Sequence, residues 1–236
     1  MQIRPLRAYV FDAYGTLFDV HSIMSLAESL APGQGAMLSQ VWRTKQLQYT
    51  WLQSLMMSAT QPRDDFAVLT AKALDYAVSQ LMLPLDVQDR QRLLAAYDTL
   101  APFSDAVAAL EALAPSPRFI LSNGTRSMLE SVVRSSSLAP HLDGVLSVDD
   151  AGIYKPAPAA YALAVAALGV DAADIGFVSS NGWDAAGAKA FGFTTFWINR
   201  DGMPTERHAA PPDFILDNLT SFAPLVAALP RWGPVP

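Results

Sequence analysis

Four short apolar runs in this sequence are each followed by polar residues that could do chemistry. Asp12 and Thr16 follow the first run, and Ser122 and Asn123 follow the second. A carboxylate can act as a nucleophile or a general base, and a nearby cation keeps it in the charged form. The other two runs are followed by Lys155 and by Ser179, Ser180, Asn181 and Asp184.

The elements that must position these residues alternate between strands and helices. The run at 8–11 is predicted to be a buried strand, and further strands are expected at 118–121, 145–148, 175–178, 194–198 and 214–216. Helices are expected between them, including one that Pro156 opens and Gly169 ends. This alternation predicts an α/β fold with a parallel sheet, whose strand ends bring the polar residues to one edge.

Each polar residue also has a plainer interpretation. Asp12 could cap a turn, Ser122 and Asn123 could begin a helix, Asp184 could sit at a helix start, and Lys155 could be solvated. Four such coincidences at one sheet edge are less expected than one, so the pattern favours a site.

Residues 19–98 contain helical patterns and no clear strand. Apolar spacing predicts a helix over 36–57, and Asp65 and Asp86 are expected to begin two more. We therefore predict an α/β core domain formed by 1–18 and 99–236, with 19–98 as a helical cap domain inserted after the first strand. Such an insertion lies over the crevice at the strand ends.

Composition excludes several classes of protein. The 236 residues carry 22 acids and 16 bases, a net charge of −6, with no cluster of bases, which disfavours nucleic acid as a partner. The absence of cysteine excludes disulfides and thiolate chemistry. The first apolar run is too short for a signal sequence, and no apolar stretch approaches the roughly 18 residues of a membrane span. We expect a cytoplasmic protein without membrane contact.

The order of the motifs resembles the haloacid dehalogenase superfamily, and more closely its L-2-haloacid dehalogenase branch. The resemblance rests on Asp12-x-Tyr14-Gly15-Thr16, Ser122-Asn123-Gly124, Lys155-Pro156, Ser179-Ser180-Asn181-x-Trp183-Asp184 and the segment from Trp42 to Leu52. It implies a Rossmann-like parallel-sheet core with an inserted helical cap domain. It also implies hydrolysis of short L-2-haloalkanoic acids to D-2-hydroxy acids and halide.

Two departures from the phosphatases of this superfamily support that branch. Phosphatases place a second Asp two residues after the nucleophile to protonate the leaving group, whereas this chain has Tyr14. They also use an acid cluster after the fourth strand to help bind Mg²⁺, whereas only Asp184 follows Ser179 and Asn181 here. A halide leaves without a proton, and a carbon–halogen bond has no phosphate charge that a metal must shield. The resemblance therefore implies no metal and no cofactor.

The resemblance assigns the first half of the reaction to residues at three strand ends. Asp12 attacks C2 of the substrate and forms an aspartyl ester. Lys155 keeps Asp12 charged, and Thr16 orients it. Ser122 and the backbone N–H groups of Ala13 and Tyr14 hold the substrate carboxylate.

The remaining roles involve the insert and the fourth strand. Arg43 and Asn123 receive the halide, because an arginine charge is permanent and weakly hydrated. Asp184, positioned by Ser179 and Asn181, helps water attack the ester. Tyr161 supports Lys155. The predicted apolar wall of the substrate pocket consists of Tyr14, Leu47, Phe66 and Trp183.

Several alternatives remain open at this point. Arg43 could be a solvated helix residue, and Leu47, Phe66 and Trp183 could be plain core. The chain could be a phosphatase of the same fold, a fluoroacetate-type dehalogenase, or a binding protein that keeps the crevice. The resemblance implies a small 2-haloacid and a halide ion as partners, and a homodimer that the helix over 36–57 could join.

Overall fold

The described part of the chain contains a parallel sheet of six strands, in the order β3-β2-β1-β4-β5-β6. This computed structural model describes residues 4–20, 22–58, 60, 62–207 and 210–230. The α/β class predicted from the alternating pattern is confirmed. The strands are β1 (Ala8–Phe11), β2 (Arg118–Ser122), β3 (Gly144–Ser147), β4 (Ile175–Ser179), β5 (Thr194–Ile198) and β6 (Phe214–Leu216).

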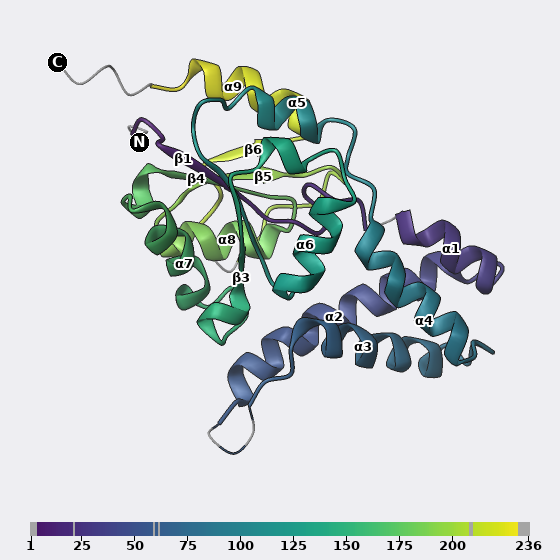
Figure 1. Cartoon of the computed structure of the whole chain (residues 1–236). Helices are drawn as coiled ribbons and strands as arrows, with labels where there is room; N and C mark the ends of the chain where they lie inside the picture. Colours follow the sequence, from purple (N-terminus) through teal and green to yellow (C-terminus); the bar gives the residue numbers. More distant parts are fainter. Residues whose placement is uncertain (1–3, 21, 59, 61, 208–209, 231–236) are drawn as a thin grey trace.

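The central strands are apolar because helices cover both faces of the sheet. Every residue of β1, β4 and β5 is buried, as expected for a strand covered on both sides. Helices α7 (Pro158–Leu168) and α8 (Gly182–Phe191) lie on one side, and α5 (Ala106–Glu111) and α9 (Phe222–Ala228) on the other (Figure 1). Helix α6 (Arg126–Arg134) packs beside β3.

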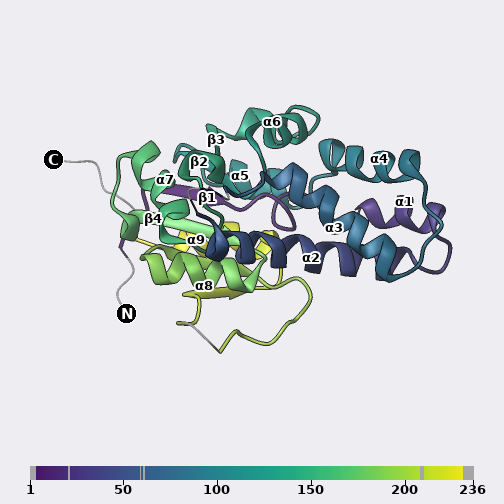
Figure 2. The same ribbon diagram turned by 90° about the horizontal axis from the view of Figure 1, so that it is seen from below.

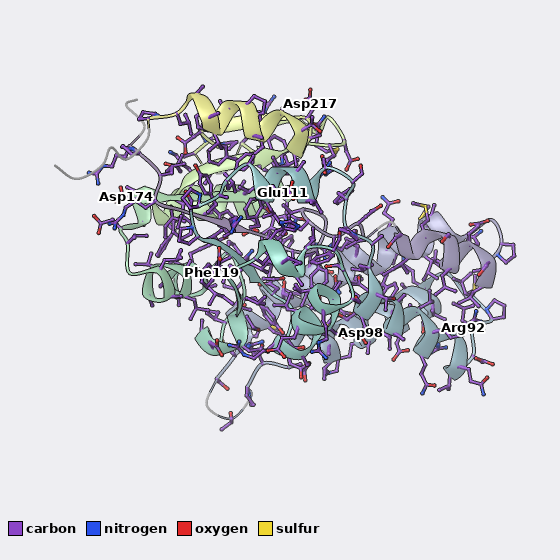
Figure 3. All side chains as sticks on the ribbon, turned by 45° about the horizontal axis from the view of Figure 1, so that its top comes forward. Arg92, Asp98, Glu111, Phe119, Asp174 and Asp217 are labelled. Carbon is purple, nitrogen blue, oxygen red and sulfur yellow. The ribbon has the colours of Figure 1, made fainter. Side chains whose placement is uncertain are left out.

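Four helices between β1 and β2 pack on one another, and we call them the helical insert. They are α1 (Ser22–Leu30), α2 (Gly35–Met56), α3 (Phe66–Gln80) and α4 (Val87–Ala95). They lie together to one side of the sheet (Figure 2). Arg92 of the insert and Asp174, which precedes β4, lie at opposite ends of the molecule, so the insert is beyond the carboxyl ends of the strands (Figure 3). The division into two domains stays a prediction.

The two connections between the sheet and the insert run side by side. Phe18 and Pro102 form an antiparallel bridge. The N–H of Asp19 donates to the carbonyl of Ala101 at 2.8 Å, and that of Phe103 to Leu17 at 2.9 Å. Both ends of the insert are therefore fixed together, a few residues from Asp12.

Local sequence signals explain several helix boundaries. The side chain of Asp65 accepts from the N–H of Val68 at the start of α3, and Asp86 forms a reciprocal capping box with Asp89 at the start of α4. The predicted start of α7 at Pro156 was wrong. The helix begins at Pro158, which takes the first-turn position that suits proline.

None of the helices in the described ranges combines the length and the apolar character needed to cross a bilayer.

Candidate active site

The site lies where the strand order reverses, between β1 and its neighbours β2 and β4. Asp12 directly follows β1, Ser122 ends β2 and Ser179 ends β4. In open α/β sheets this reversal leaves a crevice at the carboxyl ends of the strands, which is where ligands bind. The predicted meeting of strand-end polar residues therefore has a topological cause.

Asp12 is held by neighbours on both carboxylate oxygens. Its Oδ1 accepts from Nζ of Lys155 at 3.1 Å. Its Oδ2 accepts from Nδ2 of Asn181 at 2.8 Å and from Oγ1 of Thr16 at 3.3 Å. The side chain is buried, so these donors replace water around the negative charge. The carboxylate is fixed in one orientation at the floor of the site.

Lys155 joins Asp12 to a second, deeper carboxylate. Its Nζ lies 2.9 Å from Oδ2 of Asp184, and both side chains are fully buried. Burial alone would lower the pKa of Lys155, but the charges of Asp12 and Asp184 outweigh it and raise that pKa. Lys155 is therefore an ammonium ion that two carboxylates share.

Asp184 is a fully buried carboxyl group whose pKa lies close to neutral pH. Burial raises its pKa to about 6, Lys155 opposes the rise, and Asp12 adds to it. Oγ of Ser179 donates to Oδ2 at 3.0 Å, and the hydroxyl of Tyr161 donates to Oδ1 at 2.8 Å. These donors favour the charged form. Burial raises the pKa of Tyr161 well above its usual value, so its hydroxyl remains a neutral donor.

Arg43 reaches from α2 toward the strand ends. Its Nη1 donates to Oε1 of Gln46 at 2.7 Å, and its Nη2 lies 3.5 Å from the carbonyl oxygen of Tyr14. Both contacts are to neutral acceptors. Within the described residues no carboxylate forms a salt bridge with Arg43, so its charge is not neutralised by a protein acid. A partly buried cation of this kind attracts an anion.

Asp12 and Arg43 both line one small cavity. Polar groups line one part of it and apolar side chains another, which suits a short organic anion. Oδ1 of Asn123 accepts from the N–H of Lys155 at 3.0 Å, which leaves its Nδ2 as the donor group. The lining residues are Asp12, Tyr14, Arg43, Leu47, Phe66, Ser122, Asn123, Asn181 and Trp183.

Two predicted contacts differ from those observed. Asn181 was expected to position Asp184, but its amide donates to Asp12 and to the carbonyl of Tyr14, because its place as the N-cap of α8 directs it toward β1. Tyr161 was expected to support Lys155 and to contact substrate. It lies beneath Asp184 and does not line the cavity, since α7 packs against α8 behind the sheet edge.

Two residues with evident positioning roles were missed from the sequence. The N–H of Ser180 donates to Oγ1 of Thr16 at 2.8 Å, which fixes the hydroxyl that contacts Asp12. Gln46 is fully buried and donates to Thr70 at 2.7 Å while it accepts from Arg43. Its spacing of three residues from Arg43 on one helix was a usable signal.

The donor set does not fit a divalent cation. The described residues contain no group of three acidic, histidine or cysteine side chains placed to hold a metal. Both carboxylates of the site already contact the ammonium of Lys155. Proteins usually bind Mg²⁺ through carboxylates together with further oxygen ligands, and the described residues of this site do not form such a cluster.

Comparisons with known proteins agree with this geometry. Residues 6–192 match the model of the haloacid dehalogenase-like hydrolases. An (S)-2-haloacid dehalogenase of Pseudomonas sp. (strain YL) is 42% identical over 222 residues, covering 93% of this chain and 94% of that protein. Haloacetate dehalogenase H-2 of Moraxella sp. (strain B) is 40% identical over 95% of this chain and 100% of its own length.

A solved structure gives the same picture. The L-2-haloacid dehalogenase of Xanthobacter autotrophicus, with chloropropionic acid covalently bound, superposes with a TM-score of 0.88 at 39% identity. The match covers 95% of this chain and 100% of that one.

Proposed function

Because this chain belongs to the haloacid dehalogenase-like hydrolase family, we propose that it hydrolyses short-chain L-2-haloalkanoic acids to D-2-hydroxy acids and halide. The observation that carries the proposal is that Asp12 and Arg43 line the same small cavity. Asp12 supplies a carboxylate that its donors orient, and Arg43 supplies a cation without an acidic partner among the described residues. This pair suits attack at carbon with departure of an anion.

In the first step, a carboxylate oxygen of Asp12 forms a bond to C2 of the substrate while the carbon–halogen bond breaks. The electron pair of that bond leaves with the halide, so no proton is needed, and attack from the opposite side inverts C2. Ser122 and the N–H groups of Ala13 and Tyr14 hold the substrate carboxylate. Arg43 and Asn123 receive the halide.

In the second step, water attacks the carbonyl carbon of the Asp12 ester. Asp184 accepts a proton from that water and gives it to the alkoxide oxygen of the leaving group as the tetrahedral intermediate collapses. This releases the hydroxy acid, and loss of the second water proton to solvent restores the Asp12 carboxylate. Thr16 and Asn181 hold the nucleophile, and Ser179 and Tyr161 hold Asp184 from behind. Leu47, Phe66 and Trp183 form an apolar wall that limits access of other water molecules.

The proposal predicts where oxygen enters. In a single turnover of L-2-chloropropionate with excess enzyme in H₂¹⁸O, we expect the label in Asp12 and unlabelled D-lactate, because the product oxygen comes from the carboxylate. Peptide mass spectrometry and product mass spectrometry measure the two. Label that enters the hydroxy acid first would refute the ester. Loss of activity with EDTA, together with hydrolysis of p-nitrophenyl phosphate in Mg²⁺, would favour a phosphatase instead.

We further propose that residues 19–98 act as a cap domain over a core of 1–18 and 99–236, and that two copies form a homodimer through the insert. Exposed apolar side chains on α2 support the second point, because such groups favour association. Leu55 is 84% exposed and Met56 is 58% exposed. Met37 and Leu52 are also exposed on the same helix.

A charge introduced on α2 tests the homodimer. We expect sedimentation equilibrium to give twice the chain mass for the natural protein and a concentration-dependent shift toward the monomer for Leu52→Glu, because a desolvated carboxylate opposes association. Met82→Glu, at an exposed apolar residue beyond α3, is the matched control and should sediment as the natural protein does. A monomeric natural protein would contradict the proposal.

A further inference from the structure

The segment between α2 and α3 reaches across to the loop that carries Lys155. Nη2 of Arg63 lies 2.6 Å from Oδ1 of Asp149, and its guanidinium lies over the ring of Tyr154, 4.4 Å from the centroid. The Arg63 side chain is only 10% exposed, so this pair is less screened than a surface ion pair. It joins the helical insert to the loop between β3 and α7.

Tyr154 is held by the insert through three further contacts. Its hydroxyl donates to the carbonyl of Asp64 at 2.7 Å, and its N–H donates to Oγ of Ser54 at 3.3 Å. Its ring lies 6.3 Å from that of Phe66, which lines the site cavity. Tyr154 is completely buried. Burial also raises the pKa of its hydroxyl, which therefore stays protonated and can donate.

The residue after Tyr154 is Lys155, the cation at the centre of the site. Consecutive Cα atoms across a trans peptide are about 3.8 Å apart, so displacement of Tyr154 moves the backbone of Lys155 directly. On its other side, that backbone is tied to Asn123 at 3.0 Å. The backbone of Lys155 is thus held by its own hydrogen bond to Asn123, which follows β2, and by the contacts that the preceding residue, Tyr154, makes with the insert.

We propose that Arg63 and Tyr154 are positioning residues, and that with Asp64 and Asp149 they form a clasp through which the helical insert sets the place of Lys155 between Asp12 and Asp184. The kinetic consequences rest on the proposed function. The structural consequence, tighter holding of the Lys155 loop, does not.

Loosening the clasp should change the pH dependence of the reaction. Asp184 is faced by Asp12 after β1, Lys155 from the loop, Tyr161 from α7 and Ser179 from β4. If Lys155 retreats, its attraction weakens and Asp184 keeps its proton to higher pH. The proposed hydrolysis of the ester needs Asp184 ionised, so the acidic limb of kcat shifts upward.

Three variants and one control separate positioning from mere stability. Tyr154→Phe removes the bond to Asp64 and keeps the ring, Arg63→Met removes the charge, and Arg63→Lys restores a charge opposite Asp149. Arg126→Met is the control. It breaks the 2.7 Å ion pair between Arg126 of α6 and Asp150 of the same loop. Both side chains of this pair are about half exposed, and neither belongs to the insert.

We expect kcat/KM for L-2-chloropropionate to fall about 10-fold in Tyr154→Phe and Arg63→Met, since misplacement by about 1 Å can cost up to 100-fold. We also expect the acidic limb to rise by about half a pH unit. Arg63→Lys should recover part of both effects, and Arg126→Met should match the natural protein. If Tyr154→Phe and Arg63→Met lowered thermal stability but left kcat/KM and the pH of the acidic limb unchanged, the role would be merely structural and the proposal would be overturned.

Hydrogen exchange tests the clasp without reference to activity. Amides in a peptide spanning 150–157 should exchange faster in Tyr154→Phe and Arg63→Met than in the natural protein, because these two variants lose contacts to the insert. In Arg126→Met, which keeps those contacts, the exchange rates should match those of the natural protein. Natural exchange rates in both variants would overturn the clasp even if activity fell. A natural protein that released no halide would refute the proposed function and leave this measurement intact.

Discussion

Asp12→Asn is expected to lower kcat by on the order of 10⁴-fold or more, because it removes the proposed nucleophile, on which both proposed steps depend. The amide has nearly the shape of the carboxylate, so the fold should persist. Its NH₂ group, however, must face either Lys155 or the donors Thr16 and Asn181, all of which donate to Asp12. The variant therefore also loses a hydrogen bond. Halide release under saturating L-2-chloropropionate measures the effect.

The control for Asp12→Asn is Asp150→Asn. Asp150 lies near the surface and pairs with Arg126 outside the cavity, so removal of its charge should leave kcat within about twofold of the natural value. Circular dichroism establishes that both variants are folded. Turnover by Asp12→Asn above one hundredth of the natural rate, in the absence of deamidation by mass spectrometry, would mean that another group attacks the substrate.

Lys155→Met is expected to lower kcat/KM by about 10³-fold and to destabilise the fold at neutral pH by roughly 3 kcal/mol. Without the ammonium, Asp12 and Asp184 face each other across a buried space, where like charges and lost solvation both favour protonation. One of them would hold a proton at neutral pH, and the site would lack either its nucleophile or its base.

The pH dependence of that destabilisation has a definite sign. Burial already raises the pKa of Asp184 and Lys155 opposes that rise, so in Lys155→Met the folded-state pKa of Asp184 lies further above that of the unfolded chain. The folded variant then binds more protons, and its stability falls as pH rises. Denaturant unfolding of the variant and the natural protein should therefore differ most at pH 8 and least near pH 5. An equal difference at both pH values would contradict the shared role of Lys155.

Lys189→Met supplies the matched control for that experiment. Lys189 lies 2.6 Å from the buried carboxylate of Asp213, away from the cavity. Its loss should lower stability for a comparable electrostatic reason and leave kcat/KM close to the natural value. A large loss of activity in this variant would show that general destabilisation accounts for the effect at Lys155.

The meeting of Asp12, Lys155 and Asp184 could be predicted because it follows from topology. Once the chain is read as alternating strands and helices, parallel pairing places the strand ends at one edge whatever the intervening sequence is. The side chain of Asp65 caps α3 as predicted, because N-cap chemistry is local and depends on a few neighbouring residues.

The hydrogen-bond and ion-pair partners of individual side chains were harder to predict from the sequence. Asn181 donates to Asp12 rather than to Asp184 because of the direction in which the turn before α8 presents it, and residue type alone does not specify that direction. The contact of Arg63 with Asp149 joins segments 86 residues apart in sequence, without any periodic signal. Helix α9 was missed because it is a single short apolar stretch.

The side-by-side connections at Phe18 and Pro102 also bear on how such proteins diversify. Because the two ends of the insert are already bridged to each other, its length and internal packing can change without altering the spacing of β1 and β2. The entropic cost of a longer excursion grows only with the logarithm of its length. The sheet, with Asp12 at the end of β1, can thus stay constant while changes in the insert alter which molecules reach Asp12.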